Sequence, residues 1–71
     1  MSAYMLTERE LAVLRLLGRG HTNRSIAKQM LIGEGTVKSH VHSILEKLSV
    51  PNREQAMLWA LREGVATLYD S

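Results

Sequence analysis

The chain has 71 residues, 45% of them hydrophobic, with no cysteine and a formal net charge of +2 at pH 7. This length suits one small domain over residues 1–71, and the lack of cysteine excludes disulfides and thiolate metal sites. No apolar run reaches membrane-spanning length and the N-terminus lacks a signal-peptide pattern, which predicts a cytoplasmic protein with no membrane partner. Residues 1–52 carry seven basic and four acidic side chains, a net charge of +3. Residues 53–71 carry two basic and three acidic side chains, a net charge of −1. The excess of basic side chains in residues 1–52 fits an anionic binding partner.

The first helix is predicted over residues 8–17. Thr7 followed three residues later by Glu10 is the pattern of a capping box. Gly18 and Gly20 end the helical stretch. The side chains spaced for one inward face are Glu10, Val13, Leu14 and Leu17.

A second, shorter helix of about two turns follows, with Thr22 or Asn23 as its N-cap. Its inward face is made of Ile26, Ala27 and Met30. The stretch LIGEG then forms a turn in which Gly33 is placed to cap the next helix.

The third helix is predicted over residues 34–48, and its two sides differ in chemistry. The inward stripe is Val37, Val41, Ile44 and Leu48. The outward stripe is Lys38, Ser39, His42 and Glu46. Because Lys, Ser and His can all donate hydrogen bonds and only one residue is acidic, this stripe is a candidate binding surface.

A fourth helix is predicted over residues 53–63. Pro51 disfavours helix for the residue before it, Asn52 can serve as the N-cap, and Gly64 stands where a C-terminal glycine belongs. No stretch carries a useful strand signal. The predicted fold class is therefore all-α, with four helices in one compact domain.

The second and third helices together form a helix-turn-helix pattern: a short helix, a glycine-containing turn and a longer helix with a polar outer stripe. In that motif the second helix enters the DNA major groove. Lys38 and His42 lie one helical turn apart with Ser39 beside them, so all three side chains are placed to reach base edges. The alternative is that this stripe is ordinary solvated surface.

The segments LTERE and TNRSIAKQMLIGEGTVKSHVHSILEKLSVPNREQA resemble the LuxR-type DNA-binding domain, which is shared by NarL/FixJ response regulators and quorum-sensing activators. The resemblance runs from about residue 6 to residue 65. It implies a compact four-helix bundle that binds double-stranded promoter DNA as a homodimer and regulates bacterial transcription. It also implies a free-standing regulator or the C-terminal effector domain of a longer one, associated with the nucleoid when bound, with RNA polymerase as an open candidate partner.

Residue by residue, the resemblance implies two sets of DNA contacts. The base-facing positions are Lys38, Ser39 and His42. The phosphate-contacting positions are Thr22, Asn23, Arg24 and Thr36. Three positions depart from the family pattern. Gly33 replaces a preferred Ser, Ser25 replaces a common acid and so removes a capping box, and His42 replaces a Lys found in some members, which puts the target sequence in doubt.

The last helix is predicted to form a dimer interface through its outward face. That face holds Gln55, Leu58, Trp59 and Arg62 if the core side is Ala56, Met57, Ala60 and Leu61. An exposed Leu–Trp pair is unusual in a small monomer, and the family pairs through this helix. The alternative is a rotated helix in which Trp59 covers the core.

Other classes of function are weaker. His40 and His42 point roughly 200° apart on a helix, so they do not ligate one metal ion. The chain is too small for a typical substrate pocket, and its glycines do not form a phosphate loop, so we expect no enzyme, cofactor or metal. A helical protein-interaction module using Leu58 and Trp59, or a sigma-like factor dependent on RNA polymerase, remains open.

Overall fold

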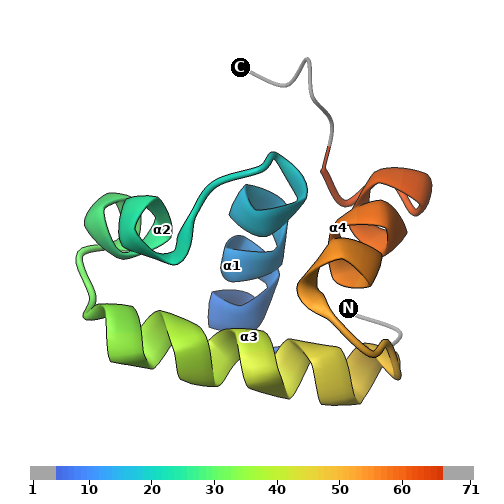
Figure 1. The fold of residues 1–71 in the computed structure, drawn as a ribbon, viewed down its shortest axis with the longest axis horizontal. Helices are drawn as coiled ribbons and strands as arrows, with labels where there is room; N and C mark the ends of the chain where they lie inside the picture. The colour runs from blue at the N-terminus through green and yellow to red at the C-terminus, as the bar shows by residue number, and fades with distance from the viewer. Residues whose placement is uncertain (1–4, 67–71) are drawn as a thin grey trace.

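The computed structural model describes residues 5–66 of the chain, which form four helices. They are α1 (Glu8–Gly18), α2 (Asn23–Met30), α3 (Glu34–Leu48) and α4 (Arg53–Arg62) (Figure 1). The all-α prediction is confirmed, and no strand occurs in residues 5–66. Two predicted bounds are wrong by one residue, because α1 includes Gly18 and α4 stops before Glu63.

The predicted caps explain where the helices begin. The Thr7 hydroxyl accepts a hydrogen bond from the Glu10 backbone N–H at 3.1 Å, and the Glu10 carboxylate accepts one from the Thr7 N–H at 2.9 Å. This reciprocal pair is the predicted capping box. The fourth helix is capped by Asn52, whose side chain accepts from the Gln55 N–H at 2.9 Å. Helix α3 begins at Glu34, and its N-cap residue Gly33 has no side chain to provide a capping hydrogen bond.

Two helices end on residues other than glycine in the left-handed conformation. Leu31 closes α2 with φ 58° and Ser49 closes α3 with φ 56°. Left-handed backbone costs a non-glycine residue roughly 1–2 kcal/mol. The Leu31 side chain is also 90% exposed, so no burial offsets this cost within the described chain.

A single apolar core lies where the inward faces of the four helices meet, with α3 running along one side of α1, α2 and α4 (Figure 1). The buried core residues are Val13, Leu14, Leu17, Ile26, Ala27, Val37, Val41, Ile44, Leu48, Ala56, Ala60 and Ala66. Helices α1 and α4 approach closely at Gly18. A Cβ added there would lie 2.8 Å from the Ala66 Cβ and 3.0 Å from the Ala60 Cβ.

Several apolar side chains sit at the margin of this core instead of inside it. Met30, Met57 and Leu61 were expected to face inward, and each is half-buried against the core. Trp59 was expected to face outward, and it too is half-buried against the core. Only this placement of Trp59 matches the alternative reading, because Ala56 and Ala60 are buried and Leu58 is exposed as expected for the helix without rotation.

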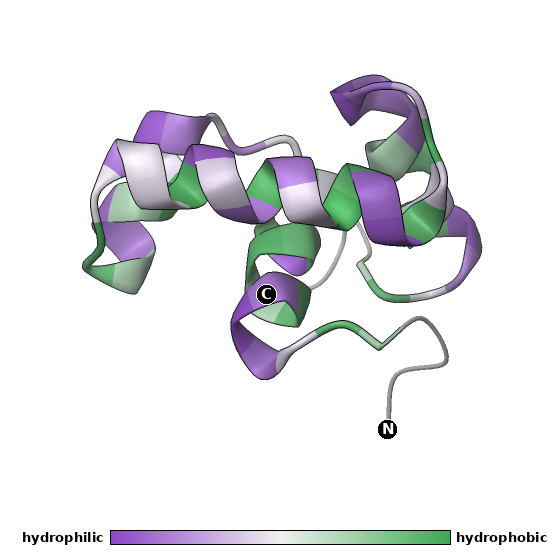
Figure 2. Cartoon of the chain, turned by 90° about the horizontal axis from the view of Figure 1, so that it is seen from below, coloured by the Kyte–Doolittle hydropathy of each residue, from purple (hydrophilic) through white to green (hydrophobic). Residues whose placement is uncertain are grey.

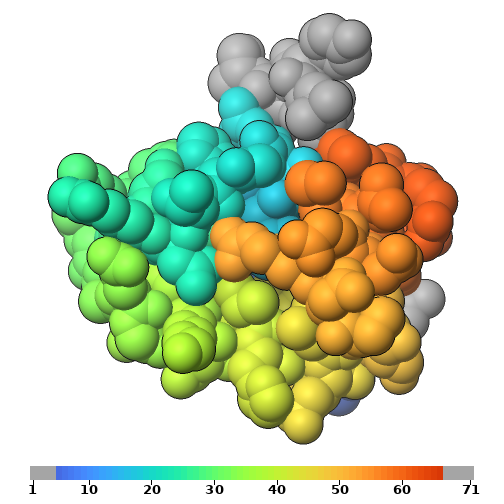
Figure 3. Space-filling model, in the orientation of Figure 1, coloured from blue at the N-terminus to red at the C-terminus, as the bar shows by residue number. Residues whose placement is uncertain are grey.

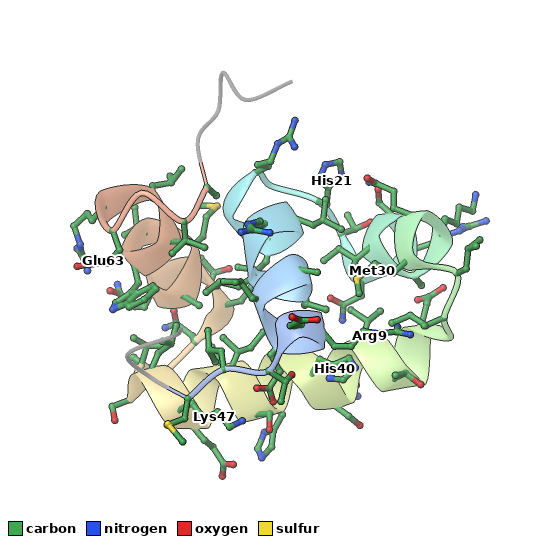
Figure 4. The ribbon with its side chains drawn as sticks, turned by 180° about the vertical axis from the view of Figure 1, so that it is seen from behind. Arg9, His21, Met30, His40, Lys47 and Glu63 are labelled. Carbon is green, nitrogen blue, oxygen red and sulfur yellow. The ribbon has the colours of Figure 1, made fainter. Side chains whose placement is uncertain are left out.

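Among residues 5–66, one charged group is buried with the apolar residues. Glu10 is 5% exposed, and its carboxylate lies 2.7 Å from the Lys47 ammonium. Lys47 also donates to the Met5 carbonyl at 3.3 Å, so it reaches from α3 to the segment that leads into α1 (Figure 4). Burial raises the pKa of Glu10, but its bonds with Lys47 and Thr7 and the Lys47 charge lower it more, leaving it below its ordinary 4.5.

Candidate nucleic-acid interface

The outward face of α3 is open to solvent. Lys38, Ser39 and His42 are exposed, whereas the next inward positions, Val37 and Val41, are buried. In the view from below, α3 lies across the front of the molecule (Figure 2), and in space-filling form it makes one edge of the surface (Figure 3). The predicted base-facing residues therefore share one accessible helix face.

The two histidines of α3 occupy different environments. His40 is half-buried and lies toward α1 (Figure 4), whereas the His42 side chain is 75% exposed. The His42 Nε2 lies 3.6 Å from the Glu46 Oε2, one helical turn further along. Glu46 therefore lies on the same outward face as His42, as the predicted outward stripe of this helix implies.

The beginnings of α2 and α3 present the predicted phosphate-contacting residues. Arg24 and Thr36 are exposed. Thr22 is exposed as well, but its hydroxyl oxygen accepts the Ser25 backbone N–H at 3.1 Å as the N-cap of α2. The Thr22 hydroxyl proton stays available to donate, because the cap uses only the oxygen as an acceptor.

Asn23 is held by a residue that the sequence analysis did not single out. Arg53 Nη1 donates to Asn23 Oδ1 at 2.5 Å, and Arg53 Nη2 donates to the His21 carbonyl at 2.7 Å. Arg53 opens α4, 30 residues from Asn23, so no local pattern indicated this contact. Because the oxygen of Asn23 is occupied, its side-chain NH₂ is the group left to donate to a phosphate.

A second hydrogen-bonded cluster lies on the surface of α2. The His21 Nδ1 is 3.0 Å from the Ser25 hydroxyl and 3.1 Å from the Gln29 Nε2, and Gln29 also donates to the Ser25 hydroxyl at 3.2 Å. These contacts tie the loop before α2, where His21 is labelled in Figure 4, to the helix itself. Together with Arg53 they fix the start of α2 relative to the rest of the fold.

The predicted dimer residues fall into two groups. Gln55 and Arg62 are exposed and Leu58 is 42% exposed, whereas Trp59 packs half-buried on the core. The exposed apolar area of α4 is therefore centred on Leu58, and Trp59 is at its margin. The assignment of this surface to a dimer stays a prediction. No helix within residues 5–66 is both long and apolar enough to cross a bilayer.

Comparison with known proteins identifies the family to which this chain is similar. The family of bacterial regulatory proteins called the luxR family matches residues 4–60. The chain is 51% identical over 61 residues to the transcriptional regulatory protein LnrK of Bacillus subtilis (strain 168). It is 44% identical over 61 residues to the response regulator protein VraR of Staphylococcus aureus (strain NCTC 8325 / PS 47).

Each alignment covers 86% of this chain but only 28% of LnrK and 29% of VraR, so the chain spans less than a third of these relatives. A solved structure of the transcription factor GerE superimposes with a TM-score of 0.76 and 40% identity, covering 89% of this chain and 94% of GerE. The sequence and fold comparisons cover similar shares of the chain. The chain therefore belongs to the luxR family of bacterial regulatory proteins, as a DNA-binding domain of the helix-turn-helix class.

Proposed function

We propose that this chain recognises a specific double-stranded DNA sequence by placing α3 in the major groove, and that it thereby regulates bacterial transcription in the cytoplasm, at the nucleoid. The observation that carries the proposal is the open outward face of α3, where Lys38, Ser39 and His42 are exposed above a buried apolar stripe. Lys38 donates to guanine acceptors, and Ser39 and His42 add hydrogen bonds of lower selectivity.

The phosphate backbone is held beside this helix by the start of α2 and the first turn of α3. Arg24 supplies a charge, while Thr22, Asn23 and Thr36 supply neutral donors. The free N–H groups and positive dipole at a helix N-terminus favour a phosphate at the same place. These contacts fix the position of α3, and the base contacts decide the sequence.

Two copies pair through α4 in this proposal, using Gln55, Leu58 and Arg62 with Trp59 at the margin. Pairing of this kind sets two recognition helices about one DNA turn, ~34 Å, apart. LnrK and VraR carry the names of a transcriptional regulatory protein and a response regulator and are more than three times longer than the matched region. We propose that this chain likewise regulates transcription, either as the effector domain of a longer protein or as a free-standing regulator.

The test is selection of bound duplexes from a random pool, followed by binding titrations of single-residue variants on the selected site. Lys38→Ala is expected to cost about 1–3 kcal/mol at one base pair if the contact is bidentate, and to relax discrimination there. Arg24→Ala is expected to weaken all sequences alike and reduce the salt slope by about one. Arg15→Ala, which removes an exposed charge from α1, is the matched control.

Two outcomes would count against the proposal. A Lys38→Ala variant that binds every sequence as the unmodified chain does would remove Lys38 from the base contacts. Absence of any salt-sensitive binding to duplex DNA at low salt would favour a protein-interaction module instead, with the exposed Leu58 of α4 as its contact.

A further inference from the structure

The base-facing stripe of α3 contains one carboxylate, and that carboxylate is next to a base-facing side chain. Glu46 Oε2 lies 3.6 Å from His42 Nε2, and the two side chains are 71% and 75% exposed. DNA repels a carboxylate, so an acid on this face lowers affinity for every phosphate around it. An acid on this face can favour binding only through the choice of base, and the side chain that Glu46 contacts on this face is His42.

The chemistry of the pair restricts the state of the imidazole ring. A carboxylate only accepts hydrogen bonds, and a neutral histidine carries one N–H and one bare nitrogen. Because Nε2 is the nitrogen beside Glu46, the favoured neutral form has the proton on Nε2 and leaves Nδ1 as an acceptor. A separation of 3.6 Å is longer than a hydrogen bond, so the carboxylate favours this form through the electrostatic contact of the pair alone.

We propose that Glu46 is a positioning residue that makes His42 an acceptor in the major groove, so that His42 selects a base with an exocyclic amine. The bases that offer such a donor in the major groove are adenine, through N6, and cytosine, through N4. This inference rests on the proposed function, since it requires His42 to face a base pair. Without Glu46, the neutral imidazole could carry its proton on either nitrogen. His42 could then also donate to guanine or thymine, and it would discriminate less between bases.

Protonation of His42 reverses the preference. A charged imidazole donates from both nitrogens, which suits the acceptors of guanine and thymine. The charged neighbours of His42 on α3 are Lys38, one turn earlier, and Glu46, one turn later. Glu10 of α1 faces α3 but pairs with Lys47, and within residues 5–66 the only ion-pair contact of His42 is the one to Glu46.

The experiment is selection from a random duplex pool at about pH 7.5 and at about pH 5.5, on either side of the range in which histidine changes charge. The chains compared are the unmodified protein, Glu46→Gln, His42→Gln and Glu34→Gln. The last variant removes an exposed acid from the first turn of the same helix, so it controls for the change in net charge. Circular dichroism checks that every variant keeps its helices.

At the higher pH, the unmodified protein and Glu34→Gln are expected to enrich adenine or cytosine at one position of the site. Glu46→Gln, whose amide both donates and accepts, is expected to lose about fivefold of that discrimination while other positions stay unchanged. At the lower pH, the unmodified protein shifts toward guanine or thymine there, and His42→Gln shows no shift.

Three results would overturn the inference. In the first, Glu46→Gln and Glu34→Gln give the same base preferences at both pH values. In the second, Glu46→Gln loses a cytosine preference at another base pair and keeps the one at His42, which would mean that Glu46 reads a base directly. In the third, the unmodified protein favours guanine or thymine at this position at the higher pH. If no chain selects any sequence, the proposed function itself fails, which is a distinct outcome.

Discussion

Replacing Lys47 with methionine tests how the buried carboxylate of Glu10 is stabilised. Methionine keeps much of the apolar length of the side chain and removes the ammonium that lies 2.7 Å from Glu10. The carboxylate, 7% exposed, would keep two neutral donors, the Thr7 N–H at 2.9 Å and the Ser43 hydroxyl, but no positive charge. We expect a large loss of stability, because an uncompensated charge would remain buried.

The magnitude follows from the burial of the two partners. Removing one partner of a fully buried pair costs roughly 3–5 kcal/mol. The Lys47 side chain is 33% exposed, so water already screens part of the interaction, and we expect ~2–3 kcal/mol. For a domain of this size that corresponds to a fall in melting temperature of about 8–24 °C.

The assay is urea unfolding followed by circular dichroism, with Glu10→Gln and the double variant completing a thermodynamic cycle. Glu10→Gln is expected to cost less, since its amide oxygen still accepts from Thr7 and Lys47 can turn to solvent. The lowered pKa of Glu10 adds stability in full above its ordinary value of 4.5, and this is lost as pH falls below 4.5.

The reasoning is refuted if Lys47→Met is as stable as the unmodified protein at neutral pH. It is also refuted if Glu10→Gln loses stability with acid as steeply as the unmodified protein does below pH 4.5. The first result would mean that Glu10 is well accommodated without its partner. The second would mean that another group causes the acid sensitivity.

Three further predictions concern packing, backbone strain and assembly. Gly18→Ala should destabilise the fold by about 1–2 kcal/mol in urea unfolding, because the new methyl group meets Ala66 and Ala60, whereas Gly35→Ala, with open space around it, should not. Leu31→Gly should raise the free energy of unfolding by about 0.5–1 kcal/mol by relieving left-handed backbone, and an unchanged value would contradict that strain. Leu58→Asp should abolish cooperative binding to paired half-sites and leave single half-site affinity unchanged; retained cooperativity would place the dimer contact elsewhere.

Most of the helical framework could be predicted from the sequence because its signals are local. The capping box of Thr7 and Glu10 and the cap at Asn52 each join residues three apart. The buried and exposed stripes of α3 follow from helical periodicity alone. Periodicity also placed Lys38, Ser39 and His42 on the outward side of α3, and the luxR-type resemblance implied that these same residues face the bases.

What the tertiary structure decided are contacts between residues far apart in the chain. Lys47 reaches Glu10 across 37 residues, and Arg53 reaches Asn23 across 30, and neither pair has a spacing that a helix or turn would reveal. The half-buried position of Trp59 likewise depends on how α4 rotates against its neighbours. Periodicity tells which side of a helix is apolar, but the packing of whole helices selects which polar groups meet and how much of a marginal side chain stays exposed.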